Sequence, residues 1–303
     1  MIKAFKKKKL LWTIVGIFSF ATIAVGIYAF TIYKSLEQTV SNMHEPLNRD
    51  VPQRVDFKKK EPLSFLILGV DERPGDRGRS DTMIVLTVNP NKKSVQMVSI
   101  PRDTRTEIIG RGYLDKINHA YAFGGVEMSV DSVENFLNIP IDYYFKVNMD
   151  SFNDIVDAVG GITVNNPLEF SQGGQTFSKG PMELDGKGAL NFVQMRKQDP
   201  RGDFGRQERQ RLVLKGVIDK GASFSSITRF GDILDALGNN IKTNLTFDEM
   251  VEIQSNYKDA RHNLEQHEIK GSGETINKVW YLVVPEQERV QISKTLRQHL
   301  DLE

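Results

Sequence analysis

Cysteine is absent from this chain of 303 residues, and histidine and tryptophan are scarce, with five and two residues. The lack of cysteine excludes disulfide bonds, thiol catalysis and zinc sites with thiolate ligands. The histidines are scattered and never show the H-x-x-x-H spacing of a helical metal site. We therefore expect neither a disulfide-stapled fold nor a histidine-based metal centre.

Net charge is also small, at +1, but it is unevenly distributed. Five lysines lie within the first nine residues, and no acidic residue precedes Glu37. Removing those lysines from the 40 basic residues leaves 35 against 39 acidic residues, a net charge of −4. A chain with this balance is not a general nucleic-acid binder, so any anion site must be local.

The longest apolar run covers 24 uncharged residues, 10–33. A bilayer core requires roughly 20 apolar residues in a helix, and the preceding lysines favour the cytoplasmic side. A cleaved signal peptide is the alternative, but the run is too long for its apolar region, and no A-x-A site follows. We expect a cytoplasmic tail (1–9), one uncleaved transmembrane helix (10–33) and a type II orientation in the cell membrane.

A polar stretch, 34–61, predicts an extracytoplasmic linker, and the folded domain is expected over 62–303. Short apolar runs rich in branched residues predict strands, and apolar residues three and four positions apart predict helices. The expected strands are 63–70, 81–88, 94–100, 142–148, 162–164 and 278–285, and the expected helices are 125–137, 149–161, 185–196, 205–221, 246–257 and 286–300. This alternation indicates an α/β domain with a mixed sheet.

Two carboxylates lie at the ends of neighbouring expected strands. Asp71 follows the first strand directly, and Asp81 opens the second. Two carboxylates held close repel each other unless a cation or a proton lies between them. Magnesium suits this geometry, because it takes one or two carboxylates and completes its shell with water and phosphate. A solvated turn with exchanging ion pairs is the alternative.

Two arginines are expected beside these carboxylates. Arg79 lies two residues before Asp81, and Arg102 follows the third expected strand. If the three strands are neighbours, both arginines share one edge of the sheet with the aspartates. The planar guanidinium group binds a diphosphate better than the point charge of lysine does.

Five further arginines lie within 195–212: Arg196, Arg201, Arg206, Arg209 and Arg211. On a helical projection, Arg206 and Arg209 lie on the apolar face of 205–221, and Arg196 lies on that of 185–196. An arginine facing the core requires an anion. Asp199 and Asp203 are available for some of these arginines, and a bound diphosphate for the others.

Four segments carry a family resemblance: "FLILGVDERPGDRGRSDTMIVLTVNPNKKSVQMVSIPRDT", "KINHAYAFGG", "VDAVGGITV" and "RKQDPRGDFGRQERQR". They occur in this order over about 62–220 and resemble the LytR-CpsA-Psr family. Within it, the chain is most similar to the polyisoprenyl-teichoic acid–peptidoglycan teichoic acid transferases of Gram-positive bacteria. The resemblance implies an α-β-α domain with a mixed sheet and a deep apolar pocket for a prenyl chain.

The resemblance also implies a phosphotransferase. Such proteins move wall teichoic acid from an undecaprenyl diphosphate carrier to a muramic acid hydroxyl of peptidoglycan, the final step of attachment. By the motif match, Asp71 and Asp81 carry Mg²⁺, with Mn²⁺ as the alternative ion. Asp203 is the candidate that activates the acceptor hydroxyl. The diphosphate would be bound by Arg79, Arg102, Arg206 and Arg209, with Arg196 and Arg201 as additional candidates.

Three other functions fit parts of the sequence. A membrane-tethered prenyl diphosphate hydrolase would use the same site with water as acceptor. A wall-polymer binding protein would bind the same carrier without turnover. A transcriptional regulator is disfavoured, because the nine residues before the apolar run are too few for a DNA-binding fold.

Overall fold

The computed structural model describes residues 27, 30–31, 33–48, 55–73, 75–148, 152–221 and 241–302. The predicted tail (1–9) and nearly all of the predicted membrane span (10–33) lie outside these residues. Among the described residues, no helix is both long and apolar enough to cross a membrane.

In the described part of the chain, six strands form the main sheet in the order β11-β6-β1-β2-β3-β12. Their bounds are β1 Leu63–Val70, β2 Ser80–Asn89, β3 Ser94–Ser99, β6 Tyr143–Asn148, β11 Ile241–Thr243 and β12 Leu264–Glu268. β1, β2 and β3 pair antiparallel, whereas β6 runs parallel to β1, and β12 runs parallel to β3. The mixed sheet predicted from the sequence is therefore confirmed.

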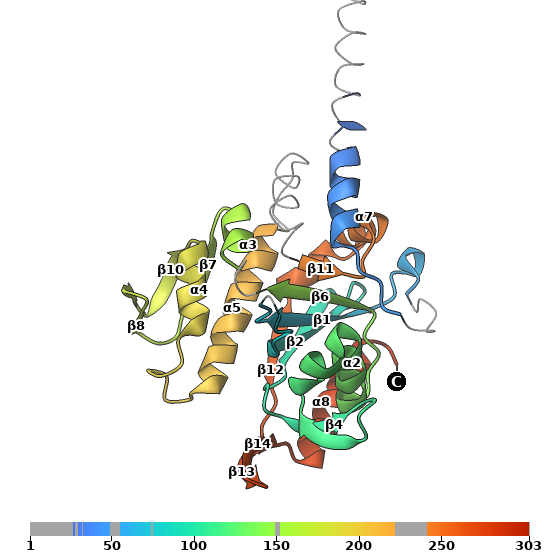
Figure 1. Ribbon diagram of the computed structural model, residues 1–303. Coiled ribbons are helices and arrows are strands. Elements are labelled where there is room, and N and C mark those ends of the chain that lie inside the picture. Colours follow the sequence, from blue (N-terminus) through green and yellow to red (C-terminus); the bar gives the residue numbers. More distant parts are fainter. Residues whose placement is uncertain are drawn as a thin grey trace, which may run out of the picture.

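Both faces of the sheet are covered, because the central strands are apolar on both sides. On one face, Leu66, Leu68 and Val85 pack against α2 (His119–Leu137) and α8 (Glu286–His299). On the other face, alternate residues pack against α5 (Asp203–Gly221) and α7 (Phe247–Asn256). Figure 1 shows these helices around the sheet. The three α-β-α layers agree with the expected architecture.

A smaller lobe packs against the outer side of α5 (Figure 1). It contains α3 Phe152–Ala158, α4 Gly186–Gln194, β7 Ile162–Asn166, β8 Phe170–Gln172, β9 Gln175–Phe177 and β10 Gly180–Leu184. At Gly216 of α5 an added Cβ would lie 3.0 Å from the Cβ of Ile162, so the helix and β7 approach closely. α5 is thus sandwiched between the main sheet and the smaller lobe, which explains why it carries apolar residues on two sides.

The remaining elements lie at the periphery. They are the hairpins β4–β5 (Arg105–Ile108 and Tyr113–Lys116) and β13–β14 (Ser272–Ile276 and Val279–Val283), and the short helices η1 (Phe57–Lys59) and η3 (Lys258–His262). A helical segment over 33–43 packs Leu36, Val40 and Met43 against Ile155 and Ile241.

A buried histidine fastens the C-terminal helix α8 to the sheet. The ring nitrogens of His299 lie 2.7 Å from the Thr87 hydroxyl on β2 and 2.9 Å from the Ser94 hydroxyl on β3. Burial is the main cause that lowers the pKa of His299 to about 4, and the nearby charge of Lys92 adds to it. The neutral ring is therefore the form that holds this contact near pH 7.

Most expected elements are present, with informative differences. Thr246 caps α7 through a complete capping box, as its sequence indicates. The strand expected over 278–285 forms in part as β14, but it belongs to a separate hairpin. The edge strand β12 was missed, because its sequence, LEQHE, has almost no apolar residues. The helix expected from 125 begins at His119 and bends at Gly125, where φ is +68°.

Candidate active site

A β-bulge positions the two predicted metal carboxylates. Gly69 pairs with Thr82, but the next pair joins Val70 to Ser80, so Asp81 is an additional residue in β2. Asp71 follows the same bulge on the other strand, and its backbone N–H donates to the Arg79 carbonyl at 3.3 Å. Bulges commonly re-aim side chains beside functional sites. Here the bulge brings Asp71 and Asp81 to one cavity.

That cavity has a volume of about 490 Å³ and lies where β1 ends and β2 begins. It is lined by Asp71, Arg73, Asp76, Gly78, Arg79, Asp81, Arg102, Asp103, Lys116, Asn118, His119 and Ala122. Four residues predicted from the sequence therefore lie around one space. We call it the charged cavity.

Arg102 lies at the centre of the charges in this cavity. Its guanidinium is 3.0 Å from Asp81 and 3.6 Å from Asp103, and Lys116 binds the other oxygen of Asp103 at 2.6 Å. Burial disfavours the charge on Arg102, but Asp81, then Asp203 and Asp103, outweigh it and raise its pKa. Arg102 is therefore a fixed cation aimed between carboxylates.

Several buried polar atoms beside the cavity have no hydrogen-bond partner among the described residues. They are Asn118 Oδ1, Asp203 Oδ1, and Arg206 Nε and Nη2. Arg206 Nη2 does lie 2.8 Å from Asp203, as an ion pair without hydrogen-bond geometry. Buried polar groups are normally satisfied, so the atoms that indicate a polar ligand are Asn118 Oδ1 and Arg206 Nε, which have no partner of either kind among the described residues. Asp203 and Arg206 join the site through the start of α5.

An apolar pocket of about 310 Å³ lies between the sheet and α5. The sheet contributes Ile67, Gly69, Thr82, Ile84, Leu86, Phe145, Val147 and Ile241. The helices contribute Phe152, Ile155, Val193, Gln210, Val213, Leu214, Val217 and Ile218. At the pocket end formed by Thr82, the Gln210 side chain donates to the Thr82 hydroxyl at 2.8 Å.

The apolar pocket and the charged cavity adjoin along the same two strands. On β1, Gly69 lines the pocket, and Asp71, which follows the strand, lines the cavity. On β2, Thr82 lines the pocket and Asp81 lines the cavity. Anion-binding side chains thus lie beside an apolar space. This arrangement can bind an amphiphile whose head is anionic and whose tail is hydrocarbon.

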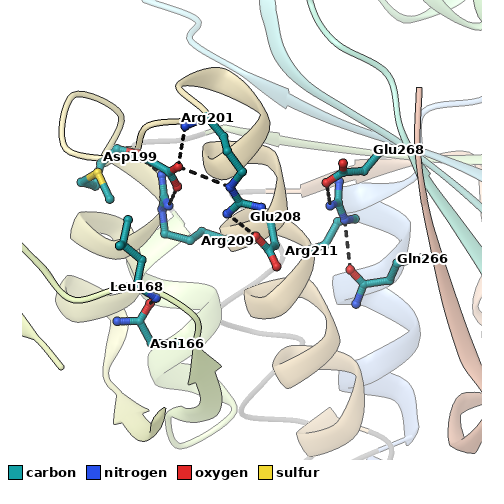
Figure 2. Close-up of polar contacts among 10 residues, drawn as sticks. Asn166, Leu168, Asp199, Arg201, Glu208, Arg209, Arg211, Gln266 and Glu268 are labelled. Atoms are coloured by element: carbon teal, nitrogen blue, oxygen red, sulfur yellow. Dashed lines mark hydrogen bonds and ion pairs between the residues drawn. The ribbon is translucent and has the colours of Figure 1, made fainter. Parts of the chain in front are cut away.

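The structure places Arg209 and Arg201 at a different carboxylate (Figure 2). Arg209 and Asp199 are both 0% exposed, with 2.7 Å between their nearest atoms, and Arg209 also donates to the Met195 carbonyl. Arg201 binds Asp199 and Glu208. The Arg209 guanidinium lies 5.4 Å from the centre of the Phe170 ring. Arg209, predicted as a diphosphate ligand, is held here inside the protein.

A glycine makes room for this buried pair. A Cβ added at Gly205 would lie 1.8 Å from the carboxylate of Asp199. Arg211 is enclosed in the same manner, because its three nitrogens donate to Gln266, Ser99 and Glu268. Figure 2 shows Arg211 reaching across to Gln266 and Glu268. The prediction that acidic residues serve part of the arginine cluster is confirmed.

The placement of Arg196 on an apolar helix face was wrong. α4 ends at Gln194, and Met195 has an extended backbone with φ −61° and ψ 131°. Arg196 therefore follows the helix and is exposed. It is not among the residues that line the charged cavity. Its role as a diphosphate ligand stays a prediction.

The residues present fit a hard divalent cation. Asp71 and Asp81 supply oxygen ligands, and the unpaired Asn118 Oδ1 lies on the same cavity. No group of three or more His, Asp or Glu within the described chain is arranged to hold a metal. Magnesium commonly uses one or two carboxylates and takes its other ligands from water and phosphate. The donor set thus suits magnesium bound together with a phosphate ligand.

Several cavity residues were missed by sequence reasoning. Asp103 adjoins Arg102, and Asn118 and His119 lie in the segment "KINHAYAFGG". The hydrogen bond from Asn118 N–H to the Arg102 carbonyl joins these two segments. No charge pattern in the sequence marks an asparagine as a site residue, so only its place in that segment was available as a signal.

The fold and the site define a mixed α/β domain with a charged cavity beside an apolar pocket. The LytR_cpsA_psr family profile matches residues 30–298, and the chain belongs to this family. It is 53% identical over 298 residues to the polyisoprenyl-teichoic acid–peptidoglycan teichoic acid transferase TagU of Bacillus subtilis (strain 168), covering 98% of this chain and 97% of that relative.

Solved structures agree with the family assignment. The crystal structure of B. subtilis TagU superposes with a TM-score of 0.67 at 53% identity, covering 80% of this chain and 97% of that one. A structure described as TagT bound to LIIa-WTA superposes with a TM-score of 0.72 at 30% identity, covering 85% of this chain and 100% of that one. The similarity therefore extends over most of this chain and nearly all of each solved structure.

Proposed function

We propose that this protein transfers wall teichoic acid from an undecaprenyl diphosphate-linked precursor to peptidoglycan. The observation that carries the proposal is that the charged cavity and the apolar pocket adjoin along β1 and β2, which matches an anionic head and a prenyl tail. The relatives named as teichoic acid transferases support the reaction class. The structure of TagT bound to LIIa-WTA supports the substrate class.

In the proposed reaction, a muramic acid hydroxyl attacks the phosphorus nearest the polymer. A new P–O bond forms to the muramic acid, and the P–O bond to prenyl phosphate breaks. Arg79 and Arg102 bind the diphosphate in the charged cavity. Arg206, which pairs with Asp203 at 2.8 Å and has a buried Nε without an acceptor among the described residues, is a further ligand. Such preorganised cations stabilise charge on the transferring and leaving groups. The hydroxyl proton passes to a carboxylate, and Asp203 is the candidate.

Asp71 and Asp81 are the proposed ligands of Mg²⁺, with Mn²⁺ as the alternative ion. When bound, such a cation supplies Lewis acid stabilisation of phosphoryl oxygens. The protein itself fixes the two carboxylates through the bulge and fixes Arg102 opposite Asp81 at 3.0 Å.

The proposed location is the cell membrane, in a single-pass type II orientation. The support is the apolar run over 10–33 behind a lysine cluster. Fusion of reporter enzymes to the C-terminus tests the orientation. An extracytoplasmic reporter should be active, and activity of a cytoplasmic reporter would contradict it.

The test of function uses the full chain in lipid nanodiscs. The substrates are a synthetic prenyl-diphosphate-linked polymer and nascent glycan strands, with Mg²⁺ present. We expect prenyl phosphate and polymer-bearing glycan in equal amounts, both abolished by EDTA. Prenyl phosphate without polymer-bearing glycan would indicate a hydrolase. Lipid binding with neither product would indicate a binding protein.

A further inference from the structure

A cluster of exposed aromatic side chains borders the charged cavity and has no part in the proposed phosphoryl transfer. Tyr113 of β5 is 43% exposed, and Phe123 of α2 is 37% exposed. Their ring centres are 6.4 Å apart in an edge-to-face arrangement, and the His119 ring lies 6.0 Å from that of Phe123. We call Tyr113, His119 and Phe123, with Arg111, the aromatic platform.

Polar contacts hold the platform in place. The Arg111 guanidinium lies 4.7 Å from the centre of the Phe123 ring and 5.6 Å from that of Tyr113. His119 Nδ1 lies 2.8 Å from the Asp115 carboxylate. Arg77 donates to the Phe123 carbonyl at 3.4 Å, which joins α2 to the loop between β1 and β2. Rings fixed in this way lose little freedom when a ligand binds.

The platform is continuous with the charged cavity. His119 and Ala122 line the cavity, and Phe123 is the next residue along α2. Lys116 of β5 also lines the cavity, three residues after Tyr113. A ligand that lies on the platform therefore reaches the space where Asp81 and Arg102 meet.

The platform and the apolar pocket lie on opposite sides of the sheet. α2 packs on the face formed by Leu66 and Leu68, whereas the pocket opens on the face formed by Ile67 and Gly69. The charged cavity lies between them, at the ends of β1 and β2. Phosphoryl transfer places the attacking oxygen and the leaving oxygen roughly in line. A prenyl phosphate leaving toward the pocket thus requires an acceptor arriving from the platform side.

We propose that the aromatic platform binds an N-acetyl amino sugar of the peptidoglycan glycan strand, as the acceptor subsite. This inference rests on the proposed transfer function and specifies where its acceptor lies. A pyranose ring presents an apolar face of C–H groups, which stacks on exposed aromatic rings, and an edge of hydroxyl and amide groups. Arg111 and Lys116 supply hydrogen-bond donors beside the rings.

The first test measures binding without turnover. The full chain in detergent micelles is titrated with purified glycan strands from which the stem peptides have been removed. Phe123→Leu and Tyr113→Ala should each raise the dissociation constant about five- to tenfold, the effect of losing one aromatic contact. The control is Trp280→Ala, which removes an aromatic side chain that is 49% exposed on the β13–β14 hairpin. The control should bind like the wild type.

The second test separates acceptor from donor. In the transfer reaction, the same two variants should raise the KM for glycan strands by a similar factor and leave the KM for the lipid-linked donor within about twofold. A rise in the donor KM instead would overturn the inference and assign the platform to sugars of the donor. Wild-type protein that does not bind glycan strands, or variants that bind like the wild type, would also overturn it.

The two proposals fail separately. Glycan binding that depends on Phe123, in a protein without transfer activity, would refute the proposed function and keep the sugar subsite. Transfer activity with glycan binding independent of Phe123 and Tyr113 would keep the function and refute the subsite.

Discussion

Two neighbouring groups of arginines differ in how their charges are satisfied. Arg209 and Arg211 point into the protein, where carboxylates, a carbonyl and a hydroxyl accept from their terminal nitrogens and the Gln266 amide oxygen accepts from Arg211 Nε. Arg206 lies one helical turn from Arg209, and its Nη2 pairs with Asp203 at 2.8 Å, while its buried Nε has no acceptor among the described residues. Arg102 pairs with Asp81 and faces an open cavity. The closed arginines, Arg209 and Arg211, thus join α5 to its neighbours, whereas the open ones, Arg102 and Arg206, lie where a bound anion can reach them.

The sharpest test of this comparison is Arg209→Met. It removes the fully buried partner of Asp199 and leaves only Arg201, whose Nε lies 3.4 Å away, so the free energy of unfolding should fall by about 3 kcal/mol. Chemical unfolding of the full chain in detergent, followed by circular dichroism, measures it. Arg206→Met is the matched control and should cost clearly less, because its pair with Asp203 lacks hydrogen-bond geometry and the two side chains are 14% and 22% exposed. Equal losses for both variants would remove the distinction between closed and open arginines.

For Asp81→Asn in the charged cavity, we expect a large loss of transfer activity and little loss of stability, the opposite of Arg209→Met. The substitution keeps the shape of the side chain but removes the charge opposite Arg102. The transfer rate should fall about 10²- to 10³-fold, while the unfolding free energy changes little. Release of prenyl phosphate measures the rate. Asp301→Asn, which breaks the surface pair with Lys92, should retain full activity. An Asp81→Asn enzyme within tenfold of the wild type would show that the chemistry lies elsewhere.

His299, with Thr87 and Ser94, forms a buried polar cluster that resembles the closed arginines, except that its central side chain is neutral near pH 7. Its pKa in the folded state is lowered to about 4, from 6.5, so the unfolded chain binds more protons between these values. Stability is therefore complete above about pH 6.5 and is lost as the pH falls toward 4, by about 3 kcal/mol. Unfolding at pH 7.5 and pH 4.5 measures the loss.

The matched variants for this prediction are His299→Gln and His262→Gln. His299→Gln should be less stable at pH 7.5 but should lose less on acidification, because the titrating ring is gone. His262 is exposed, and its replacement should leave the pH dependence unchanged. Parallel pH profiles for His299→Gln and the wild type would refute the assignment.

The smallest expected effect concerns the apolar side of the site. Val217→Phe fills part of the pocket between α5 and the sheet. The KM for a donor with a long prenyl chain should rise roughly tenfold, whereas the KM for a ten-carbon donor should stay the same. An equal change for both donors would show that the tail does not enter this pocket.

The sequence was sufficient for the central part of the fold. Apolar runs such as 63–70 identified buried strands, because both faces of the sheet are covered. It was insufficient at the edges, where β12 has the sequence LEQHE and is held by pairing to β3 and by Arg211. Those contacts join residues more than fifty positions apart, so the sequence of the strand itself does not predict them.

The site shows the same limit. Asp71, Arg79, Asp81 and Arg102 meet in one cavity because strand order places their ends together, as the sequence predicted. The helical projection also identified Arg209 as inward-facing, but it does not distinguish an arginine bound by Asp199 from one bound by a ligand. That distinction depends on Gly205, whose missing side chain admits the Asp199 carboxylate.

The bulge at Asp81 separates the loop that borders the charged cavity from the paired residues of β1 and β2 that form the core. Thr82 and the residues after it pair with β1 in a register that lies beyond the bulge and beyond the loop 71–79. Changes in that loop can therefore alter the cavity without shifting an apolar residue to the wrong face of the sheet. For the same reason, residues inserted or deleted between Asp71 and Arg79 would act on the charged cavity while leaving the pairing of β1 with β2 intact.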